Sequence, residues 1–385
     1  MSVTQVTTKN IISMDASKLT GALPAMDGSN VTGASSVTKS TSDPAIDTNP
    51  SGGVGTLWLN KTSGEMFALT DATANANVWY NVGGGDGDVQ PYTFQGTISG
   101  YNAGGYEGGE APGNIIDKFS LSSDANATDV GDLTQSRGVP AGQTSTTHGY
   151  ACGGDNPTTT NIIDKFSFSV DGNATDVGDL IAARRAGAGH SMSTHGYYSG
   201  GVVSGSYSDV IQKFTFSADA NATDVANLTL ARSNISGTNS ATHGYTQAGF
   251  TGSANSNNRN IIEKFSFAAG TDATDVGDLT TIIRDGAGAS SETNGYHSGG
   301  YTPPSSNAIE KYSFSSDGNS SNIGTLTEGR HAATGQSSTT HGYSSSGYNG
   351  GNKNVIDKFT FASDNNATDV GDLTTSRFGT AGSQK

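Results

Sequence analysis

The sequence predicts an all-β protein whose larger part is a six-bladed β-propeller of four-stranded blades. Glycine supplies 54 of the 385 residues and charged residues only 14%, which argues against helical bundles and coiled coils because these need Ala, Leu, Glu and Lys in quantity. From about residue 92 the chain repeats with a period of about 47 to 51 residues. Each repeat holds four short strand-like segments separated by Gly, Asn, Asp and Ser, and none has a helical period.

The first ninety residues lie outside this repeat and divide into two parts. Residues 1–50 are polar and bury too little apolar surface to fold alone, so we expect an extended segment that includes a linker at 34–53. Residues 51–90 alternate apolar and polar positions and predict a small three-stranded meander. Trp58, Phe67 and Trp79 are its expected core. The predicted domains are therefore 1–50, 51–90 and 91–385.

The repeat is defined by three anchors that recur in one order. The first is a Gly-Tyr pair, usually followed by Gly-Gly; the second is an apolar-acidic-Lys-aromatic strand; the third is TDVGDL or a variant, followed by an arginine. The anchor tyrosines are Tyr101, Tyr150, Tyr197, Tyr245, Tyr296 and Tyr343; the lysines are Lys118, Lys165, Lys213, Lys264, Lys311 and Lys358; the arginines are Arg137, Arg184, Arg232, Arg284, Arg330 and Arg377.

This layout resembles the kelch repeat over residues 92–385. The Gly-Tyr strand that ends in Gly-Gly and the Lys-Phe strand match that pattern, whereas the outer tryptophan is absent and Thr or Val stands in its place. The resemblance implies a propeller fold and no particular chemistry.

Ring closure is expected to involve the C-terminal tail. Only eight residues follow Arg377, and residues 381–385 match the innermost strand predicted at 141–145. We expect the tail to supply the inner strand of the first blade and so remove an exposed edge. Residues 92–98 are the alternative for the same place.

Two phrases near the N-terminus resemble segments of virion proteins of tailed bacteriophages, especially tail fibres and appendages. They are DASKLTGALPAMDGSNVTG at 15–33 and GTLWLNKTSGEMFALTDAT at 55–73, the latter continued by NVWYNV at 77–82. The resemblance implies a virion location, N-terminal docking on other virion proteins through residues such as Leu19, Leu23 and Pro24, and a distal domain that contacts the host. It also implies a homo-oligomer such as a trimer, which nothing in the repeats themselves predicts.

Charge and composition exclude several kinds of partner. The formal net charge of -15 argues against nucleic acid, because phosphate binding needs clustered Lys and Arg. No run approaches the roughly 18 apolar residues of a membrane span and no secretion leader opens the chain, so we expect no membrane insertion. The one cysteine, Cys152, excludes internal disulfides.

No catalytic, metal or cofactor motif is found, so an enzyme is not expected. The recurring Lys, Arg and His (His148, His195, His243 and His341) are interpreted as structural, with Lys118 and its equivalents expected to meet acids such as Asp132 or Asp179. The repeated turn at 124–129 places Asp124, Asn126 and Asp129 at alternating spacing; turn chemistry is favoured, and a weak Ca²⁺ site is the alternative.

The most variable segments lie between the Gly-Gly end and the Lys-Phe strand. They are expected to be loops on one rim of the disc and include Tyr106, Tyr207, Tyr301 and Tyr348. Tyrosines among Asn and Ser suit recognition of a host surface glycan or protein; the alternative is that they only cap the blade edges.

The predicted function is therefore a bacteriophage tail fibre or appendage that binds the host surface without catalysis. Two alternatives remain: a capsid decoration or fibre that binds only other virion proteins, and a polysaccharide-degrading spike. The spike would need paired carboxylates at one pocket, whereas the acids here recur around the repeats.

Overall fold

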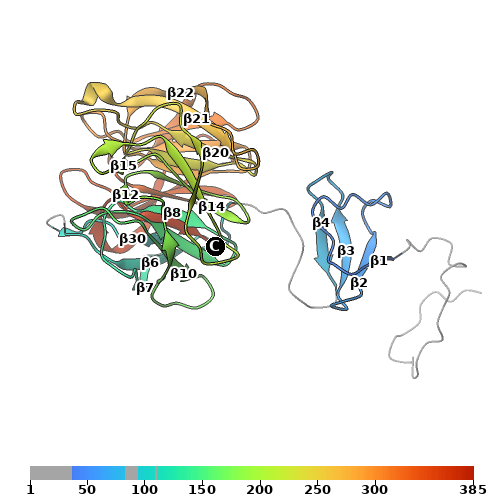
Figure 1. Ribbon diagram of the computed structural model, residues 1–385. Coiled ribbons are helices and arrows are strands. Elements are labelled where there is room, and N and C mark those ends of the chain that lie inside the picture. Colours follow the sequence, from blue (N-terminus) through green and yellow to red (C-terminus); the bar gives the residue numbers. More distant parts are fainter. Residues whose placement is uncertain (1–36, 83–93, 109–110) are drawn as a thin grey trace, which may run out of the picture. The chain divides into compact units, whose positions relative to one another are not determined.

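The computed structural model describes residues 37–82, 94–108 and 111–385. It divides into two compact units, Met1–Pro91 and Tyr92–Lys385, which are drawn in blue and in cyan to red in Figure 1. The described residues form short strands joined by turns and loops, together with a short 3-10 helix, η4, at Asn255–Asn257. The predicted all-β class is confirmed.

The first unit contains a four-stranded sheet in the order β1-β2-β3-β4. The strands are β1 (Thr38–Ser40), β2 (Leu57–Asn60), β3 (Met66–Asp71) and β4 (Val78–Asn81). Trp58 meets Trp79 edge to face at 5.9 Å between ring centroids, beside buried Phe67 and Leu69. Trp58, Phe67 and Trp79 thus form the core as predicted.

The sheet extends further toward the N-terminus than the predicted meander. β1 comes from the expected linker and pairs in parallel with β2. The indole of Trp58 donates a hydrogen bond to the carbonyl of Ser42 at 2.9 Å, and Asn60 donates to Asp43 at 2.8 Å. These side-chain contacts over long sequence separations, which no local pattern reveals, hold residues 38–43 against the sheet. The predicted docking residues Leu19, Leu23 and Pro24 lie outside the described residues.

In the second unit, as far as the structure describes it, six four-stranded antiparallel sheets account for the repeat. They are β31 (Ala381–Gln384), β5 (Ser99–Ala103), β6 (Ile115–Ser120), β7 (Thr128–Asp132); β8 (Ala141–Thr144), β9 (His148–Cys152), β10 (Ile162–Ser167), β11 (Thr175–Asp179); β13 (Ala188–Ser191), β14 (His195–Ser199), β17 (Val210–Thr215), β18 (Thr223–Asn227); β19 (Ser236–Asn239), β20 (His243–Gln247), β21 (Arg259–Ser266), β22 (Thr274–Ile283); β23 (Ala287–Ser290), β24 (Asn294–Ser298), β25 (Ala308–Ser313), β26 (Ser321–Thr325); and β27 (Thr334–Ser337), β28 (His341–Ser345), β29 (Lys353–Thr360), β30 (Thr368–Arg377).

A smaller sheet accompanies them. It joins β12 (Arg184–Arg185), β15 (Val202–Val203) and β16 (Ser206–Tyr207) in the order β12-β15-β16. It therefore links the segment before β13 to the connection between β14 and β17. The four-strand repeat is compatible with a propeller-like fold.

The Gly-Tyr anchor has a packing reason. In the β5–β6 pair, Gly100 lies opposite Phe119, and a Cβ on Gly100 would come within 2.4 Å of the phenyl ring. The glycine therefore leaves room for the aromatic side chain on the next strand, and the same pairing recurs at Gly149 and Phe166. The tyrosine beside the glycine points into the interface with the neighbouring sheet.

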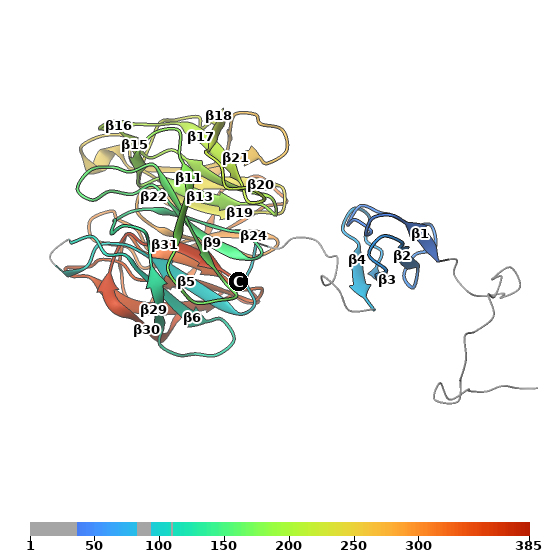
Figure 2. The same ribbon diagram turned by 60° about the horizontal axis from the view of Figure 1, so that its bottom comes forward.

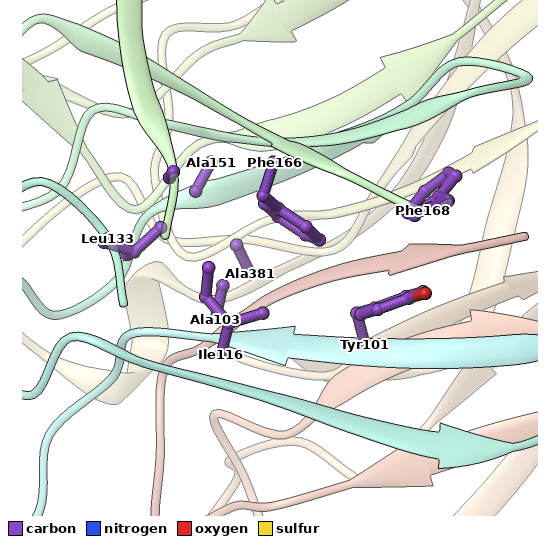
Figure 3. Packing of buried hydrophobic residues seen from close by; sticks show 9 residues of the cluster. Tyr101, Ala103, Ile116, Leu133, Ala151, Phe166, Phe168 and Ala381 are labelled. Atoms are coloured by element: carbon purple, nitrogen blue, oxygen red, sulfur yellow. The ribbon is translucent and has the colours of Figure 1, made fainter. Parts of the chain in front are cut away.

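Neighbouring sheets are joined through these tyrosines. Tyr101 packs on Phe166 and Phe168 of the next sheet, with ring centroids 5.5 and 4.9 Å away. Figure 3 shows this cluster, in which Ile116 and Ala381 face the same space. Five further clusters of buried apolar residues in the described part of the unit join the other neighbouring pairs. Each buried aromatic ring removes a large apolar area from water and adds ring-ring attraction.

The C-terminal tail supplies the inner strand of the first sheet, as predicted. β31 pairs antiparallel with β5, with Ser383 opposite Tyr101, and Figure 2 shows the two strands side by side. The alternative assignment of residues 92–98 to this place is wrong, because β31 occupies that edge of β5. The inner strands then contact one another in a cycle in the order β8, β13, β19, β23, β27, β31 and back to β8.

A ring of backbone hydrogen bonds ties the starts of these inner strands together. The amide of Val139 donates to Gly379, that of Gly379 to Ala332, and the chain of bonds continues around the axis with N···O distances of 2.7 to 3.2 Å. The six members are Val139, Ala186, Asn234, Asp285, Ala332 and Gly379, and all have positive φ. Left-handed backbone at non-glycine residues carries strain, which the closed ring offsets.

Glycine occupies the second position of each inner strand because the strands approach too closely for a side chain. A Cβ on Gly335 would lie 1.9 Å from the carbonyl oxygen of Gly288, and one on Gly142 would lie 2.0 Å from that of Gly382. We call this set the axial glycines: Gly142, Gly189, Gly237, Gly288, Gly335 and Gly382.

We predict that Gly335→Ala destabilises the protein by about 1–3 kcal/mol, because backbone on two inner strands must move to admit one methyl group. Denaturant unfolding at neutral pH would measure the change. Gly351→Ala is the matched control, since a Cβ there meets nothing within 4 Å. Equal stability of the two variants would contradict the crowding at the axis.

Candidate functional site

The four predicted rim tyrosines lie on the connections between the second and third strands of their sheets. All four are half-buried. Tyr106 donates its hydroxyl to Asp155, and Tyr207 donates to the carbonyl of Gly252 at 2.7 Å. Burial, with the hydrogen bond to Asp155, raises the pKa of Tyr106 above its ordinary value, so the hydroxyl keeps the proton that it donates.

Three of these tyrosines stand at equivalent positions and Tyr207 does not. Tyr106, Tyr301 and Tyr348 directly follow the Gly-Gly or Ser-Gly end of the second strand; in the sheet of Tyr207 the corresponding residue is Val202. Tyr207 lies on the same rim but comes from β16. Its ring centroid is 6.1 Å from that of Phe250, which is the residue of the following sheet equivalent to Val202. The structure thus brings the four tyrosines to one rim.

Three residues connect the tyrosines: Phe378 and His331, which the sequence analysis did not single out, and Arg284, which it placed in the arginine series. Phe378 lies between Tyr106 and Tyr348, at 5.2 and 5.5 Å. His331 lies between Tyr348 and Tyr301, at 5.5 and 4.8 Å. Arg284 places its guanidinium 4.9 Å from the Tyr301 ring and 4.4 Å from that of Phe250. We call the resulting series the aromatic arc: Tyr106, Phe378, Tyr348, His331, Tyr301, Arg284, Phe250 and Tyr207.

The arc results from pairing between two parts of the repeat. The residue after Gly-Gly forms an isolated β-bridge with the residue that follows the buried-arginine position, as in Tyr106 with Phe378 and His331 with Tyr348. In sequence these residues are far apart. A comparison of the position after the arginine across the repeats, which reads Gly138, Arg185, Ser233, Arg284, His331 and Phe378 once aligned, would have revealed them.

That alignment also corrects the predicted arginine series. Ile283, not Arg284, occupies the buried position and is 2% exposed, while Arg284 lies one residue later, on the rim. The difference was hidden because Arg284 directly follows Ile283, so an arginine still stands within one residue of the repeated position.

Two hollows flank the Phe378 side of the arc. The first has a volume of about 540 Å³ and is lined by Tyr106, Pro112, Asp155, Asn156, Pro157, Arg185 and Phe378; we call it the Asp155 hollow. The second has a volume of about 630 Å³ and includes Glu107, Tyr348 and Asn352. Both fall in the size range of roughly 300–1,000 Å³ that is usual for small-molecule sites.

The centre of the ring offers much less room. The mouth at Val139, Ala186 and Asn234 encloses about 80 Å³, and the space beside the axial glycines about 110 Å³. The rim, rather than the axis, is therefore the candidate functional surface.

The repeated lysines have a structural role, but the predicted partners were wrong. Lys118 contacts Asp171 at 2.7 Å and Lys264 contacts Asp317 at 2.6 Å. The acid is the first Asp of the turn in the next sheet, not Asp132 or Asp179, because the lysine leaves its strand toward the neighbouring sheet. The aspartates are 50 to 59% exposed, so each pair contributes little.

The repeated arginines, which stand at or just after the end of an outer strand, form fully buried pairs with an acid on the third strand of the neighbouring sheet. Arg137 contacts Asp164 at 2.9 Å, and Arg330 contacts Asp357 at 2.9 Å, with both partners 0% exposed. Thr134 adds two hydrogen bonds to Asp164, of 2.9 Å from its amide and 2.7 Å from its hydroxyl. A buried pair needs such extra donors, because desolvation offsets much of the attraction.

Two sheets depart from this pattern. In one, Ile283 replaces the arginine. In the other, Gln212 stands at the position of the acid that pairs with the equivalent arginines, and its side-chain nitrogen has no hydrogen-bond partner. Arg184 instead donates to the carbonyls of Ala182 and Gly200 at 3.4 and 3.3 Å. Burial lowers the pKa of Arg184.

The repeated histidines are also structural. In each case the Nδ1 atom forms a hydrogen bond of 2.8 Å with the hydroxyl of the preceding threonine, as for Thr147 and His148. Burial and the nearby lysine lower the pKa of His148. The sequence analysis did not single out His190 and His297, which are fully buried; burial lowers the pKa of each to about 4.

The acidic turns use their oxygens within the protein. Asp124 pairs with Lys358, Asn126 accepts from the amide of Asp372 at 3.0 Å, and Asp129 accepts from that of Gly131 at 3.1 Å. Across the described ranges, no three His, Cys, Asp or Glu side chains gather closely enough to hold a metal ion. Cys152 is buried and lies 2.9 Å from the side-chain oxygen of Gln143.

No helix in the described part of the chain has the length and apolar character needed to cross a membrane. Comparison of the sequence with models of known protein families and with curated proteins finds no match.

We predict that Gln212→Glu stabilises the protein, by about 1–3 kcal/mol, because it removes an unpaired buried amide and gives Arg184 the carboxylate that Arg232 has in Glu263. Thermal and denaturant unfolding would measure the gain. The reciprocal variant Glu263→Gln should be destabilised, and a loss of stability in both variants would contradict this account.

We predict that His190 makes the fold sensitive to acid. Its pKa falls from 6.5 to about 4 on folding, so its contribution is complete above pH 6.5 and is lost as the pH falls toward 4, by about 3 kcal/mol at most. In His190→Gln the new amide can reach the next sheet as Gln143 does when it donates to Tyr197. Its stability should fall less steeply between pH 6.5 and 4.5; parallel profiles would refute the assignment.

Proposed function

We propose that the Tyr92–Lys385 unit is a six-bladed kelch-like β-propeller in which each four-stranded sheet is one blade. The cycle of contacts between inner strands and the ring of hydrogen bonds from Val139 to Ala186 support this proposal. The Gly-Tyr and Gly-Gly elements occupy the second strand, and the Lys-Phe element the third. The outer tryptophan of the kelch pattern remains absent.

We propose further that the protein is a bacteriophage tail fibre or appendage, whose N-terminal part attaches to the particle and whose propeller binds the host cell surface without catalysis. The resemblance of residues 15–33 and 55–82 to phage virion proteins supports the first half. The aromatic arc carries the second half, because aromatic rings and polar groups concentrated on rim loops suit recognition of surface glycans or proteins.

The charged groups support binding rather than hydrolysis. Asp117, Asp164, Glu263 and Asp357 are buried and paired with arginines that stand at or just after the end of the outer strand of the preceding blade, which uses these carboxylates in packing. If several chains assemble on one particle, weak contacts at several rims add by avidity, which can exceed single-site affinity by orders of magnitude.

Replacing residues 301–307 and 348–354 by Gly-Ser segments of equal length should strongly reduce adsorption of the purified protein to host cells, because both replacements interrupt the arc. Adsorption is measured by sedimenting cells with labelled protein. Replacement of residues 268–271, at the opposite ends of the strands, is the control and should leave adsorption unchanged. Unaltered adsorption after both rim replacements would refute the binding surface.

A cryo-EM map of the particle would test the other half of the proposal. We expect residues 1–50 to contact another virion protein and the propeller to point outward. A propeller enclosed by other virion proteins on all sides would refute host contact.

A further inference from the structure

The Asp155 hollow lies at the place where the rim series is interrupted. Between Tyr348 and Tyr301 the space is filled by His331, and between Tyr106 and Tyr348 it is filled by Phe378. The corresponding residue beside Tyr106 and Asp155 is Gly138, which has no side chain. A Cβ on Gly138 would come within 2.2 Å of the Tyr106 ring. The ring therefore lies against bare backbone, and a volume of about 540 Å³ remains open beside it.

A buried carboxylate holds the polar wall of this hollow in place. Asp155 is 4% exposed. One of its oxygens accepts from the hydroxyl of Tyr106 and the other from the guanidinium of Arg185. Both oxygens are thus used, and their partners come from different blades. The carboxylate fixes Tyr106 and Arg185 before any ligand arrives, which lowers the entropy lost on binding.

The remaining polar groups point to hydroxyl recognition. The Arg185 side chain is 44% exposed, and only its Nη1 atom is engaged by Asp155, so further N–H donors are accessible from solvent. The amide nitrogen of Asn156 donates to the carbonyl of Ser136 at 2.7 Å, which leaves the amide oxygen as an acceptor. The Arg185 guanidinium can donate hydrogen bonds to two neighbouring hydroxyl groups, and the amide oxygen of Asn156 can accept one from a hydroxyl.

The apolar wall suits the carbon face of a sugar ring. Phe378 and Tyr106 contact each other at 5.2 Å, and Pro112 and Pro157 complete the lining. Apolar walls with a few fixed polar groups are the usual composition of a small-ligand site. The charge of Arg185 is balanced by Asp155, and the chain carries a net charge of -15, so an anionic group would find no uncompensated cation.

We propose that the Asp155 hollow binds one pyranose unit of a neutral glycan. This inference rests on the proposed function, in that the glycan belongs to the surface to which the propeller adsorbs. The pyranose places its C–H face toward Phe378 and Pro157 and two adjacent hydroxyls toward Arg185 and Asn156.

Saturation-transfer NMR on the full chain tests this with the methyl glycosides of glucose, galactose and mannose, and with methyl glucuronide as the anionic comparison. At least one neutral glycoside should bind, and more tightly than methyl glucuronide. Asn156→Trp, which fills the hollow from an exposed loop, should abolish the signal. Arg185→Lys, which keeps the charge beside Asp155 but lacks the planar fork, should weaken binding by about tenfold or more, as expected for one lost charge-assisted hydrogen bond.

Asn365→Trp is the matched control, because Asn365 is exposed in a turn between the third and outer strands of its blade. It should bind like the unsubstituted protein, and all variants should keep the thermal unfolding midpoint of the parent. Absence of binding by every neutral glycoside, equal binding by Asn156→Trp, or tighter binding of methyl glucuronide would each overturn the inference.

Adsorption to host cells, measured on the same variants, separates this inference from the proposed function. If the parent protein and Asn156→Trp adsorb equally and no glycoside binds, the hollow is not the site although host binding stands. If a neutral glycoside binds in the hollow and Asn156→Trp abolishes it, the site stands even where the parent fails to adsorb, and the host-binding proposal falls.

Discussion

The close approach of the inner strands at the axis is the constraint on which the second unit depends. A Cβ at Gly335 would lie 1.9 Å from backbone of the next inner strand, so only glycine allows the strands to meet. At this separation the residues just before the strands can bond amide to carbonyl around the axis, from Val139 to Ala186 and onward. Such a ring must close, and β31, which pairs with β5, is the element that closes it.

Because the inner strands approach closely at the axis, the residues that vary between repeats lie away from it. The mouth encloses about 80 Å³, whereas the Asp155 hollow has about 540 Å³. The sheets are held together by contacts that recur in the repeat, such as Tyr101 on Phe168 and Arg137 on Asp164. The residues that differ most between repeats therefore collect where they cost the fold least, on the rim. The aromatic arc and its neighbouring hollows occupy that place.

The exceptions within the repeat show how the same framework accommodates different chemistry. Ile283, at the end of β22, replaces the buried arginine, and Glu310 of the neighbouring sheet is held by the amide and hydroxyl of Thr280 at 2.7 and 2.8 Å. In another repeat, Gln212 stands at the position of the acid that would pair with Arg184. The same buried position between neighbouring sheets is thus satisfied with a different balance of charge in different repeats.

The sequence by itself determined the all-β class, the strand order within each repeat, the aromatic core of the small sheet and the role of the C-terminal tail, because these follow from periodicity and from short-range residue patterns. It also placed Tyr106, Tyr301 and Tyr348 on variable loops. Only the tertiary structure decided which residues join them. Phe378 and Tyr106 are separated by most of the chain, Lys118 reaches an acid of another sheet rather than Asp132, and Gly138 leaves room for the Tyr106 ring. Such contacts arise when the ring closes, and a local pattern does not encode them.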